Sequence, residues 1–126
     1  MRNVQIQIDS QYDLTTFTVV GKVAAEVVRN AIQKFYEGNV TMNVLWDLSG
    51  SDLSSITSSE INGIAKTPRK YASMRTGGKT AIVAPTDLTF GLTRMYGIMT
   101  EVQDLPFETQ VFRTTEEAHQ WLLETE

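Results

Sequence analysis

The sequence contains no cysteine and only one histidine, His119. Without cysteine there is no disulfide framework and no thiolate chemistry, and the composition fits a reducing compartment. A lone histidine argues against a zinc site. It also gives no support to a Ser-His-Asp arrangement, because His119 stands near the far end of the chain. We therefore predict no metal, no cofactor and no catalytic residues.

Long apolar runs are also missing. No stretch approaches the ~20 residues that span a bilayer. The first ten residues alternate apolar and polar side chains, unlike a signal peptide. We expect a cytoplasmic location and no membrane span. A length of 126 residues suits a single domain over residues 1–126, and a hydrophobic content of 41% is enough to build its core.

The charge is weakly acidic, with a formal net value of −4. Nucleic-acid binding needs a basic footprint, so we predict no nucleic-acid partner. One short stretch is nevertheless basic and free of acidic residues: Lys66, Arg69, Lys70, Arg75 and Lys79. This basic patch is either a solvated face or a contact for a headgroup or an anionic partner.

Hydrophobic periodicity predicts five strands. Residues 4–8 alternate as in a half-buried strand, and residues 14–20 resume after a polar turn, which indicates a hairpin. Residues 44–48 and 80–84 are short apolar strands of the buried kind, and residues 107–112 form the last strand. An exposed edge of the hairpin offers a way to pair two copies of the chain, so a homodimer is one expectation.

Four helices separate these strands. The first runs from Val23 toward Gly38, which we expect to end it in a left-handed conformation. The second begins at Ser58, behind a capping box made by Thr57 and Glu60. At Pro68 it either kinks, which we favour, or gives way to a separate short helix.

The third helix begins with Asp87 as its cap and carries an apolar stripe at near-ideal spacing: Leu88, Leu92, Met95, Met99 and Val102. Gly91 and Gly97 lie inside it, which suggests close packing or room for a ligand. The fourth begins with a capping box of Thr114 and Glu117. The order β-β-α-β-α-β-α-β-α predicts an α/β fold with a mixed, mostly parallel five-stranded sheet and four helices.

Two segments carry a resemblance to a known family. Val44-Leu45-Trp46-Asp47-Leu48-Ser49-Gly50 is a strand that leads into a polar loop. Val111-Phe112-Arg113, with Glu116-Glu117-Ala118 and Trp121-Leu122, is a strand that runs into the last helix. In this order and spacing they resemble the STAS fold, and more narrowly the SpoIIAA-like (STAS/SEC14-type) family of small bacterial proteins. The resemblance covers nearly the whole chain and implies a regulatory, non-enzymatic domain.

The resemblance also implies a modification site. In the anti-sigma-factor antagonists of this fold, an Asp-Ser-Ser-Gly motif at the start of the second helix is phosphorylated on serine by a partner kinase. The matching residues here make Ser58 and Ser59 candidates for phosphorylation, although Thr57 replaces the acidic residue and Glu60 the glycine. The alternative is that both serines only cap the helix.

Polar residues after the third strand mark a second candidate site. Asp47, Ser49 and Asp52 fall where open α/β sheets place their ligands, in a segment expected to be a loop over residues 49–55. Asp47 either orients a loop amide, binds a cation or stabilises a turn. An enzyme that uses Asp47 or Asp52 is the weakest hypothesis, because no partner base or metal set is visible.

Apolar residues mark a third candidate site, an apolar ligand pocket lined by Trp46, Met74, Leu92, Met95, Tyr96 and Met99. Methionine suits cavities that accept varied hydrophobic shapes, but such a stripe also occurs in ordinary cores. The function hypotheses are therefore a regulatory domain that acts by protein–protein contact and, as the alternative, a carrier of a small apolar or lipid-like ligand.

Overall fold

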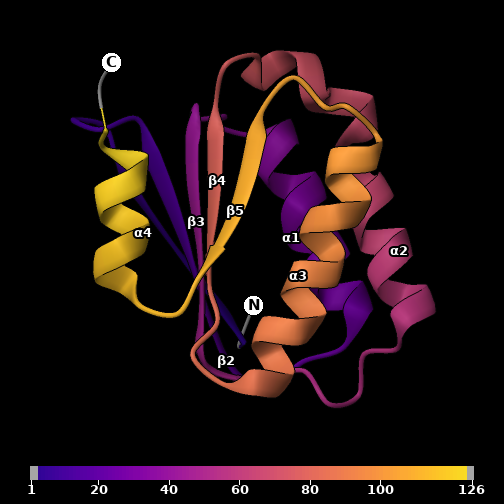
Figure 1. Cartoon of the computed structure of the whole chain (residues 1–126). Helices are drawn as coiled ribbons and strands as arrows, with labels where there is room; N and C mark the ends of the chain where they lie inside the picture. Colours follow the sequence, from indigo (N-terminus) through magenta and orange to yellow (C-terminus); the bar gives the residue numbers. More distant parts are fainter. Residues whose placement is uncertain (1–2, 125–126) are drawn as a thin grey trace.

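The computed structural model describes residues 3–124, so residues 1, 2, 125 and 126 of the expected domain lie outside the described residues. The order of strands and helices is the predicted one, with one additional 3-10 helix, η1 (Figure 1). The elements are β1 (Val4–Asp9), β2 (Leu14–Lys22), α1 (Ala25–Glu37), β3 (Asn43–Asp52), α2 (Ser58–Lys66), η1 (Thr67–Arg75), β4 (Lys79–Val83), α3 (Asp87–Val102), β5 (Glu108–Phe112) and α4 (Thr115–Leu122).

The five strands form one sheet in the order β1-β2-β3-β4-β5. β1 and β2 are antiparallel, with Val4 opposite Val19 and Ile6 opposite Phe17, which confirms the hairpin. The pairings of β2 with β3, β3 with β4 and β4 with β5 are all parallel. The predicted mixed, mostly parallel sheet is therefore confirmed.

The helices are divided unequally between the two faces of the sheet. Figure 1 shows α1, α2 and α3 on one face and α4 on the other. α4 packs mainly against β4, β5 and β3. The part of that face formed by β1 and β2 therefore has no helix over it.

The main core lies between the sheet and the three-helix layer. Phe17 of β2 stacks on Trp46 of β3, with ring centroids 4.2 Å apart and an interplanar angle of 9°. Phe35 of α1 meets Phe17 edge-on at 5.8 Å. A smaller core lies under α4 and contains Leu45, Ala81, Ala118 and Leu122. Both cores follow from alternation along the strands, which sends successive side chains to opposite faces.

The apolar stripe predicted on α3 is only partly buried, because Leu92, Met95 and Met99 pack against the main core and its two end residues do not. Thr89, Thr93 and Thr100 are buried, whereas Leu88 and Val102 are 57% and 81% exposed. The hydroxyls of Thr93 and Thr100 are satisfied by carbonyls of the same helix, which makes their burial tolerable. Thr93 Oγ1, for example, donates to the Thr89 carbonyl at 2.8 Å. Helical spacing identifies an apolar stripe, but it does not fix which way the stripe is rotated relative to the sheet.

Around Pro68, neither predicted alternative is fully met. α2 ends at Lys66, and the chain continues directly as η1 with Pro68 in its first turn. Proline has no N–H to donate to an α-helical bond, so the change to 3-10 geometry at this point has a local cause. The outcome is nearer to a separate short helix than to the kink that we favoured.

Two predicted helix ends also differ. The cap of α3 is Thr86, whose side chain accepts from the Thr89 amide, and Asp87 is the first helical residue, paired with Arg113 at 2.9 Å. Gly38 follows α1 as predicted, but its φ of −115° is not left-handed. The capping box of Thr57 and Glu60 is confirmed, and Thr114 caps α4.

Candidate functional site

The third strand is longer than predicted. Residues 49–52 belong to β3 and pair with the end of β2, after a register shift between Thr18 and Val20. The expected loop over residues 49–55 is therefore wrong for residues 49–52, whereas residues 53–55 do lie in the connection to α2, which consists of residues 53–57. The serine- and glycine-rich composition concealed the strand, because its stability comes from pairing with β2 rather than from local propensity.

Asp47 and Ser49 lie inside β3 rather than in a loop. The Asp47 carboxylate accepts hydrogen bonds from the Ser49 amide, at 3.0 Å, and from the Ser49 hydroxyl. Asp47 also lines a hollow on the α4 side of the sheet, together with Thr16, Thr18 and His119. No hydrogen bond between Asp47 and His119 occurs in the part of the chain that the structure describes.

Sequence reasoning missed this hollow, which is lined by the exposed His119 of α4 and by side chains of β2. The alternation of Leu14, Thr16 and Thr18 along β2 contained the signal. Polar side chains at every second position indicate a strand face without a covering helix.

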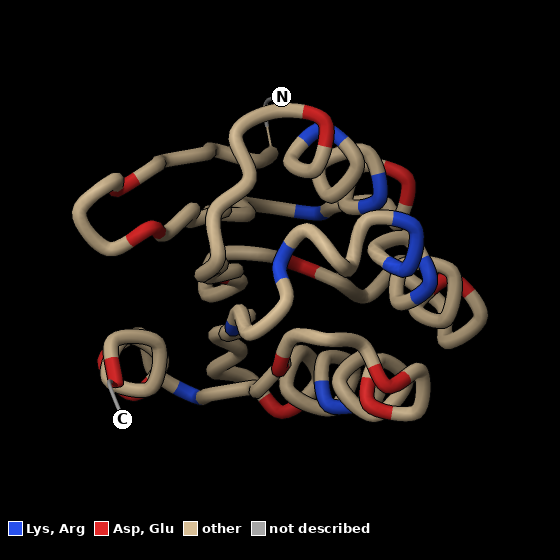
Figure 2. The backbone as a smooth tube through the Cα atoms, turned by 90° about the horizontal axis from the view of Figure 1, so that it is seen from above, with Lys and Arg blue, Asp and Glu red and all other residues tan. Residues whose placement is uncertain are grey.

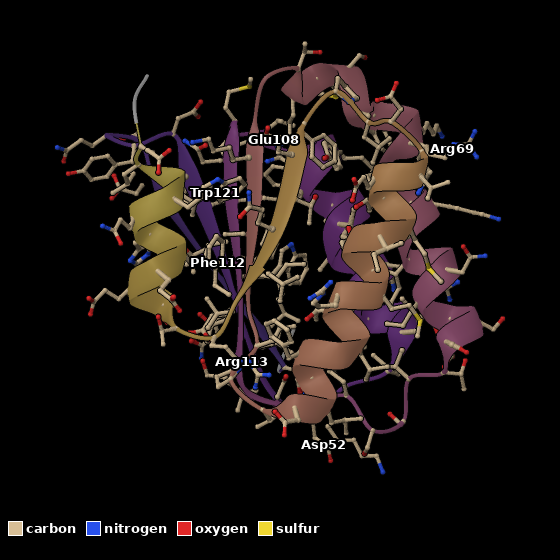
Figure 3. All side chains as sticks on the ribbon, viewed as in Figure 1. Asp52, Arg69, Glu108, Phe112, Arg113 and Trp121 are labelled. Carbon is tan, nitrogen blue, oxygen red and sulfur yellow. The ribbon has the colours of Figure 1, made fainter. Side chains whose placement is uncertain are left out.

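Asp52 ends β3 at the carboxyl end of the sheet (Figure 3). Its carboxylate accepts a hydrogen bond from the Ser54 amide at 2.9 Å. Hydrogen bonding from the Ser54 side chain and backbone, aided by the charge of Lys22, holds the pKa of Asp52 below its usual value. Asp47 and Asp52 therefore belong to different surroundings and do not form a carboxylate pair.

The segment between β3 and α2 has apolar residues that are buried in the core and polar residues that face solvent. Leu53 and Ile56 are buried in the main core. The remaining residues up to the first turn of α2 expose their side chains to solvent: Ser54, Ser55, Thr57, Ser58 and Ser59. These five residues are called the β3–α2 surface below. Two buried apolar anchors, Leu53 and Ile56, therefore hold in place a segment whose polar residues are exposed.

Ser58 and Ser59 do not cap α2. Thr57 is the cap: its hydroxyl accepts from the Glu60 amide at 3.1 Å, and its own amide donates to the Glu60 carboxylate at 2.9 Å. Ser58 and Ser59 take the first two positions of the helix, with exposed side chains. Capping does not account for them, and a negative charge on either would lie at the positive end of the helix.

The predicted apolar pocket is only partly assembled. Trp46 and Tyr96 line a small apolar cavity between the sheet, α1, α2 and α3, together with residues that the prediction missed: Val28, Ile32, Leu48, Leu53, Ile56, Ile61, Ile64, Ile82 and Thr93. Burial raises the pKa of the Tyr96 hydroxyl well above its usual range. The cavity measures about 60 Å³, whereas pockets for drug-sized ligands measure roughly 300–1,000 Å³.

The other predicted pocket residues lie elsewhere. Leu92, Met95 and Met99 are half-buried against the main core and do not line the cavity. Met74 lies on η1 and is 50% exposed. The rotation of α3 that buries its threonines explains the difference, because it turns the apolar stripe toward α2 and solvent.

The prediction of an exposed basic patch is wrong for two of its five residues. Arg75 is buried, with only 2% of its surface exposed. Lys79 is half-buried, and its ammonium donates to the Trp121 carbonyl at 2.9 Å and stands over the Trp121 ring. Both cations therefore serve the fold. Lys66, Arg69 and Lys70 are exposed on α2 and η1. Figure 2 shows Lys and Arg positions gathered along the backbone on the side of the three-helix layer, and Figure 3 labels Arg69.

Arg75 fixes the amino ends of β3 and β4. Its five N–H groups donate to the carbonyls of Thr41, Met42 and Lys79 and to the hydroxyls of Thr80 and Tyr36, over 2.8–3.3 Å. The Phe107 ring lies 4.6 Å from the guanidinium carbon. No ion pair involves Arg75 within residues 3–124. Sequence reasoning missed this role because a charged residue in a basic stretch is normally solvated.

Among residues 3–124, no helix is long and apolar enough to cross a membrane. In the same range, no group of three or more His, Cys, Asp or Glu side chains is placed to hold a metal ion.

No model of a known protein family matches the chain, and no curated protein matches it. Solved structures do match. An uncharacterized protein with a SpoIIAA-like fold from Shewanella loihica PV-4 is 19% identical, with a TM-score of 0.60, over 95% of this chain and 94% of that one. An anti-sigma factor antagonist from Mycobacterium paratuberculosis is 15% identical, with a TM-score of 0.58, over 96% and 93%. The unphosphorylated anti-sigma factor antagonist SpoIIAA is 16% identical, with a TM-score of 0.54, over 97% and 99%. At these identities the likeness establishes the fold, which is SpoIIAA-like and agrees with the resemblance found in the sequence.

Proposed function

We propose that this SpoIIAA-like domain is a non-enzymatic regulator that contacts a protein partner through the β3–α2 surface, under the control of phosphate on Ser58 or Ser59. The fold that it shares with two anti-sigma factor antagonists supports the regulatory role. The observation that carries the proposal is the exposure of both serines beside a cap that Thr57 and Glu60 complete without them. The sequence favours the cytoplasm as the place of action.

A phosphate at this position would change binding more than folding. It adds a charge of about −1.5 to −2, which the amino end of a helix tolerates. No basic side chain lies in the first turn of α2, whereas Glu60 does. The phosphate would change a neutral hydroxyl surface into a strongly acidic one.

The contact is tested by site-specific photo-crosslinking in the native host. A photoreactive residue is placed at Ser59 and, as a matched control, at Gln120, which is exposed on α4 at the opposite face of the sheet. The proposal predicts a defined heterodimer band from position 59 only. Equal crosslinking from both positions, or none from position 59, would contradict the proposed contact.

The switch is tested separately by peptide mapping of protein isolated from the host with phosphatases inhibited. The expected result is one phosphate on Ser58 or Ser59 that disappears when both are replaced by alanine. Ser54 and Ser55 serve as internal controls, because both are exposed but precede the helix. Phosphate on those residues instead would contradict the assignment to α2.

The apolar cavity supports a carrier function as a second candidate. Its lining is almost entirely aliphatic and aromatic, and it lies between the helices where the carrier hypothesis expects a ligand. A volume of about 60 Å³ requires α2 and α3 to separate before a lipid-like molecule fits. Native mass spectrometry of freshly isolated protein tests this candidate. It predicts a stoichiometric apolar adduct, and a bare mass would exclude tight carriage.

Pairing of two copies through β1 is a further part of the proposal. β1 is an edge strand, and Ile6 and Ile8 are 53% and 52% exposed on it. Gln5 and Gln7 leave the middle of this edge uncharged, so it lacks the lysine and proline that commonly block edge pairing. Sedimentation of the wild type and of Ile6→Lys tests this. A dimer that the substitution converts to monomer is expected, and a wild-type monomer at every concentration would exclude it.

A further inference from the structure

We propose that the free edge of β5, with the groove between β5 and α3, binds an extended peptide segment of a partner protein as an added β-strand. The segment is basic at the end that lies beside Glu108. This surface does not include the β3–α2 surface, so the proposal does not rest on the function proposed above. Figure 3 shows the two ends of the edge, with Glu108 at one end of β5 and Arg113 just beyond the other.

The backbone of β5 offers unused hydrogen-bonding groups. The Glu108 amide donates to Gly78 at 3.0 Å and the Phe112 carbonyl accepts from Ala84 at 2.8 Å, so these residues face β4. In a strand the direction alternates, and both the N–H and the C=O of Thr109 and Val111 therefore point away from the sheet. The backbone hydrogen bonds formed outside helices and strands in residues 3–124 do not include these groups. Such an edge is a template for an added strand.

A groove follows this edge. Two adjoining hollows lie between β5 and α3, and both are lined by Gly97, Glu101, Thr109 and Gln110. The Thr109 hydroxyl is buried and has no hydrogen-bond partner among the described residues. Leaving such a group unsatisfied costs about 1–3 kcal/mol. Rotation of the Thr109 side chain about χ1 would turn this hydroxyl toward the groove, where a bound peptide would supply the missing partner.

Gly97 keeps the groove open. Glycine inside a helix costs about 1 kcal/mol relative to alanine. A Cβ at Gly97 would meet only the Val111 side chain at 4.0 Å, an ordinary contact, so packing within the chain does not require glycine here. Gly91, one and a half turns earlier, likewise meets nothing within 4 Å, but it does not line either hollow. Gly91 is therefore a matched control for Gly97.

The charges along the groove give the peptide a direction. Glu101, Asp104 and Glu108 line the hollow at the amino end of β5. Arg94 lines the other hollow, which continues toward Val111. A segment with lysine or arginine at the Glu108 end and a neutral or acidic residue near Arg94 matches this pattern. Charges at a rim mainly fix orientation and speed association rather than supply affinity.

The test is a selection of phage-displayed random decapeptides against the full chain, with Gly97→Leu and Gly91→Leu proteins as comparators. Leucine at position 97 fills the groove, whereas leucine at position 91 leaves it unchanged. We expect enriched peptides with alternating β-branched residues and a basic end. Their Kd should rise about tenfold or more in Gly97→Leu and change less than about twofold in Gly91→Leu. The Thr109 and Val111 amide resonances should shift on binding.

Each alternative result overturns the proposal. No enrichment over the Gly97→Leu protein would show that the edge does not accept strands. Enriched peptides that bind Gly97→Leu unchanged, or that shift the amides of β1 or α2 instead, would place the binding surface elsewhere. Amide spectra and unfolding midpoints of both variants establish that the fold is retained. A peptide with an N-methylated backbone provides a second measurement, because it should lose binding if backbone pairing carries the interaction.

Discussion

At the amino ends of the parallel strands, the guanidinium of Arg75 is buried and all its donors are used within the chain. At the carboxyl ends, the hydroxyls of Ser58 and Ser59 are exposed, and the cap beside them is complete without them. Both regions are connections: Arg75 lies at the end of η1, just before β4, and Ser58 and Ser59 follow the segment that joins β3 to α2. Figure 1 shows them at opposite ends of the sheet.

The difference separates residues that stabilise the fold from residues that are available to a partner. A buried polar group whose donors and acceptors are satisfied inside the chain stabilises the fold, because its removal leaves its buried partners unpaired. A polar group that the chain does not use can change or be modified with little effect on folding. Substitutions at the two ends should therefore act on different properties.

The largest effect is expected at Arg75. In Arg75→Met, the carbonyls and hydroxyls that accept from the guanidinium lose their partners in a buried site. The free energy of unfolding should fall by roughly 3 kcal/mol or more, because each buried acceptor left unsatisfied costs about 1–3 kcal/mol. Arg69→Met is the matched control: it lies on the same helix with an exposed side chain, and a change within about 0.5 kcal/mol is expected. Urea unfolding measures both. Equal effects would contradict the assigned role of Arg75.

The next effect is expected at Gly78, between η1 and β4. A Cβ at this position would overlap the Met42 carbonyl and lie 2.9 Å from the Arg75 carbonyl, so the backbone must shift. Gly78→Ala should lower the free energy of unfolding by about 2 kcal/mol. Gly91→Ala should raise it by about 1 kcal/mol, because nothing there opposes a better helix former. Thermal unfolding would contradict this account if both substitutions shifted the midpoint in the same direction.

At the carboxyl end the stability effects should be smaller and confined to Thr57. Thr57→Ala removes the helix cap and should cost about 1 kcal/mol. Ser58→Ala and Ser59→Ala should each change the free energy of unfolding by less than about 0.5 kcal/mol, because neither hydroxyl is used by the fold. Denaturant midpoints for the three variants check this. A larger loss of stability in Ser59→Ala than in Thr57→Ala would show that Thr57 is not the residue that caps α2.

The smallest effect concerns Asp52. Hydrogen bonds from Ser54 favour the ionised carboxylate and lower its pKa. A lowered folded-state pKa contributes stability above the unfolded value, and this contribution is lost as the pH falls through the folded pKa. Because the carboxylate is fully exposed, the effect on stability should be slight. In an NMR titration, Ser54→Ala should move the pKa of Asp52 back toward its ordinary value. An unchanged titration would show that Ser54 is not the cause.

The fold could be predicted because its signals are local. Each of these signals lies within the element that it predicts. Examples are the alternation in residues 4–8, the Thr57–Glu60 capping box and the apolar runs of residues 44–48 and 80–84. What could not be predicted depends on contacts between distant segments. The extension of β3 to Asp52 depends on pairing with β2, and the rotation of α3 depends on packing against the sheet.

The candidate site shows the same division. The exposure of Ser58 and Ser59 follows from a cap that is visible in the sequence. The burial of Arg75 does not, because its acceptors come from α1, β4 and the segment between α1 and β3. The position of the predicted pocket residues also depends on distant contacts. Leu92, Met95 and Met99 share one stripe of α3, so the rotation of this helix against the sheet keeps all three out of the cavity together.

The most direct test of the central claim is the affinity of the domain for the protein crosslinked at position 59. It should be measured by calorimetry for the wild type, for Ser58→Asp with Ser59→Asp, and for Arg69→Ser as the control at the other end. The account predicts that the double aspartate variant binds about tenfold or more weakly, equivalent to roughly 1.4 kcal/mol, with an unchanged unfolding midpoint. Arg69→Ser should bind like the wild type. An unchanged affinity in the double variant, or a loss only in Arg69→Ser, would contradict the account.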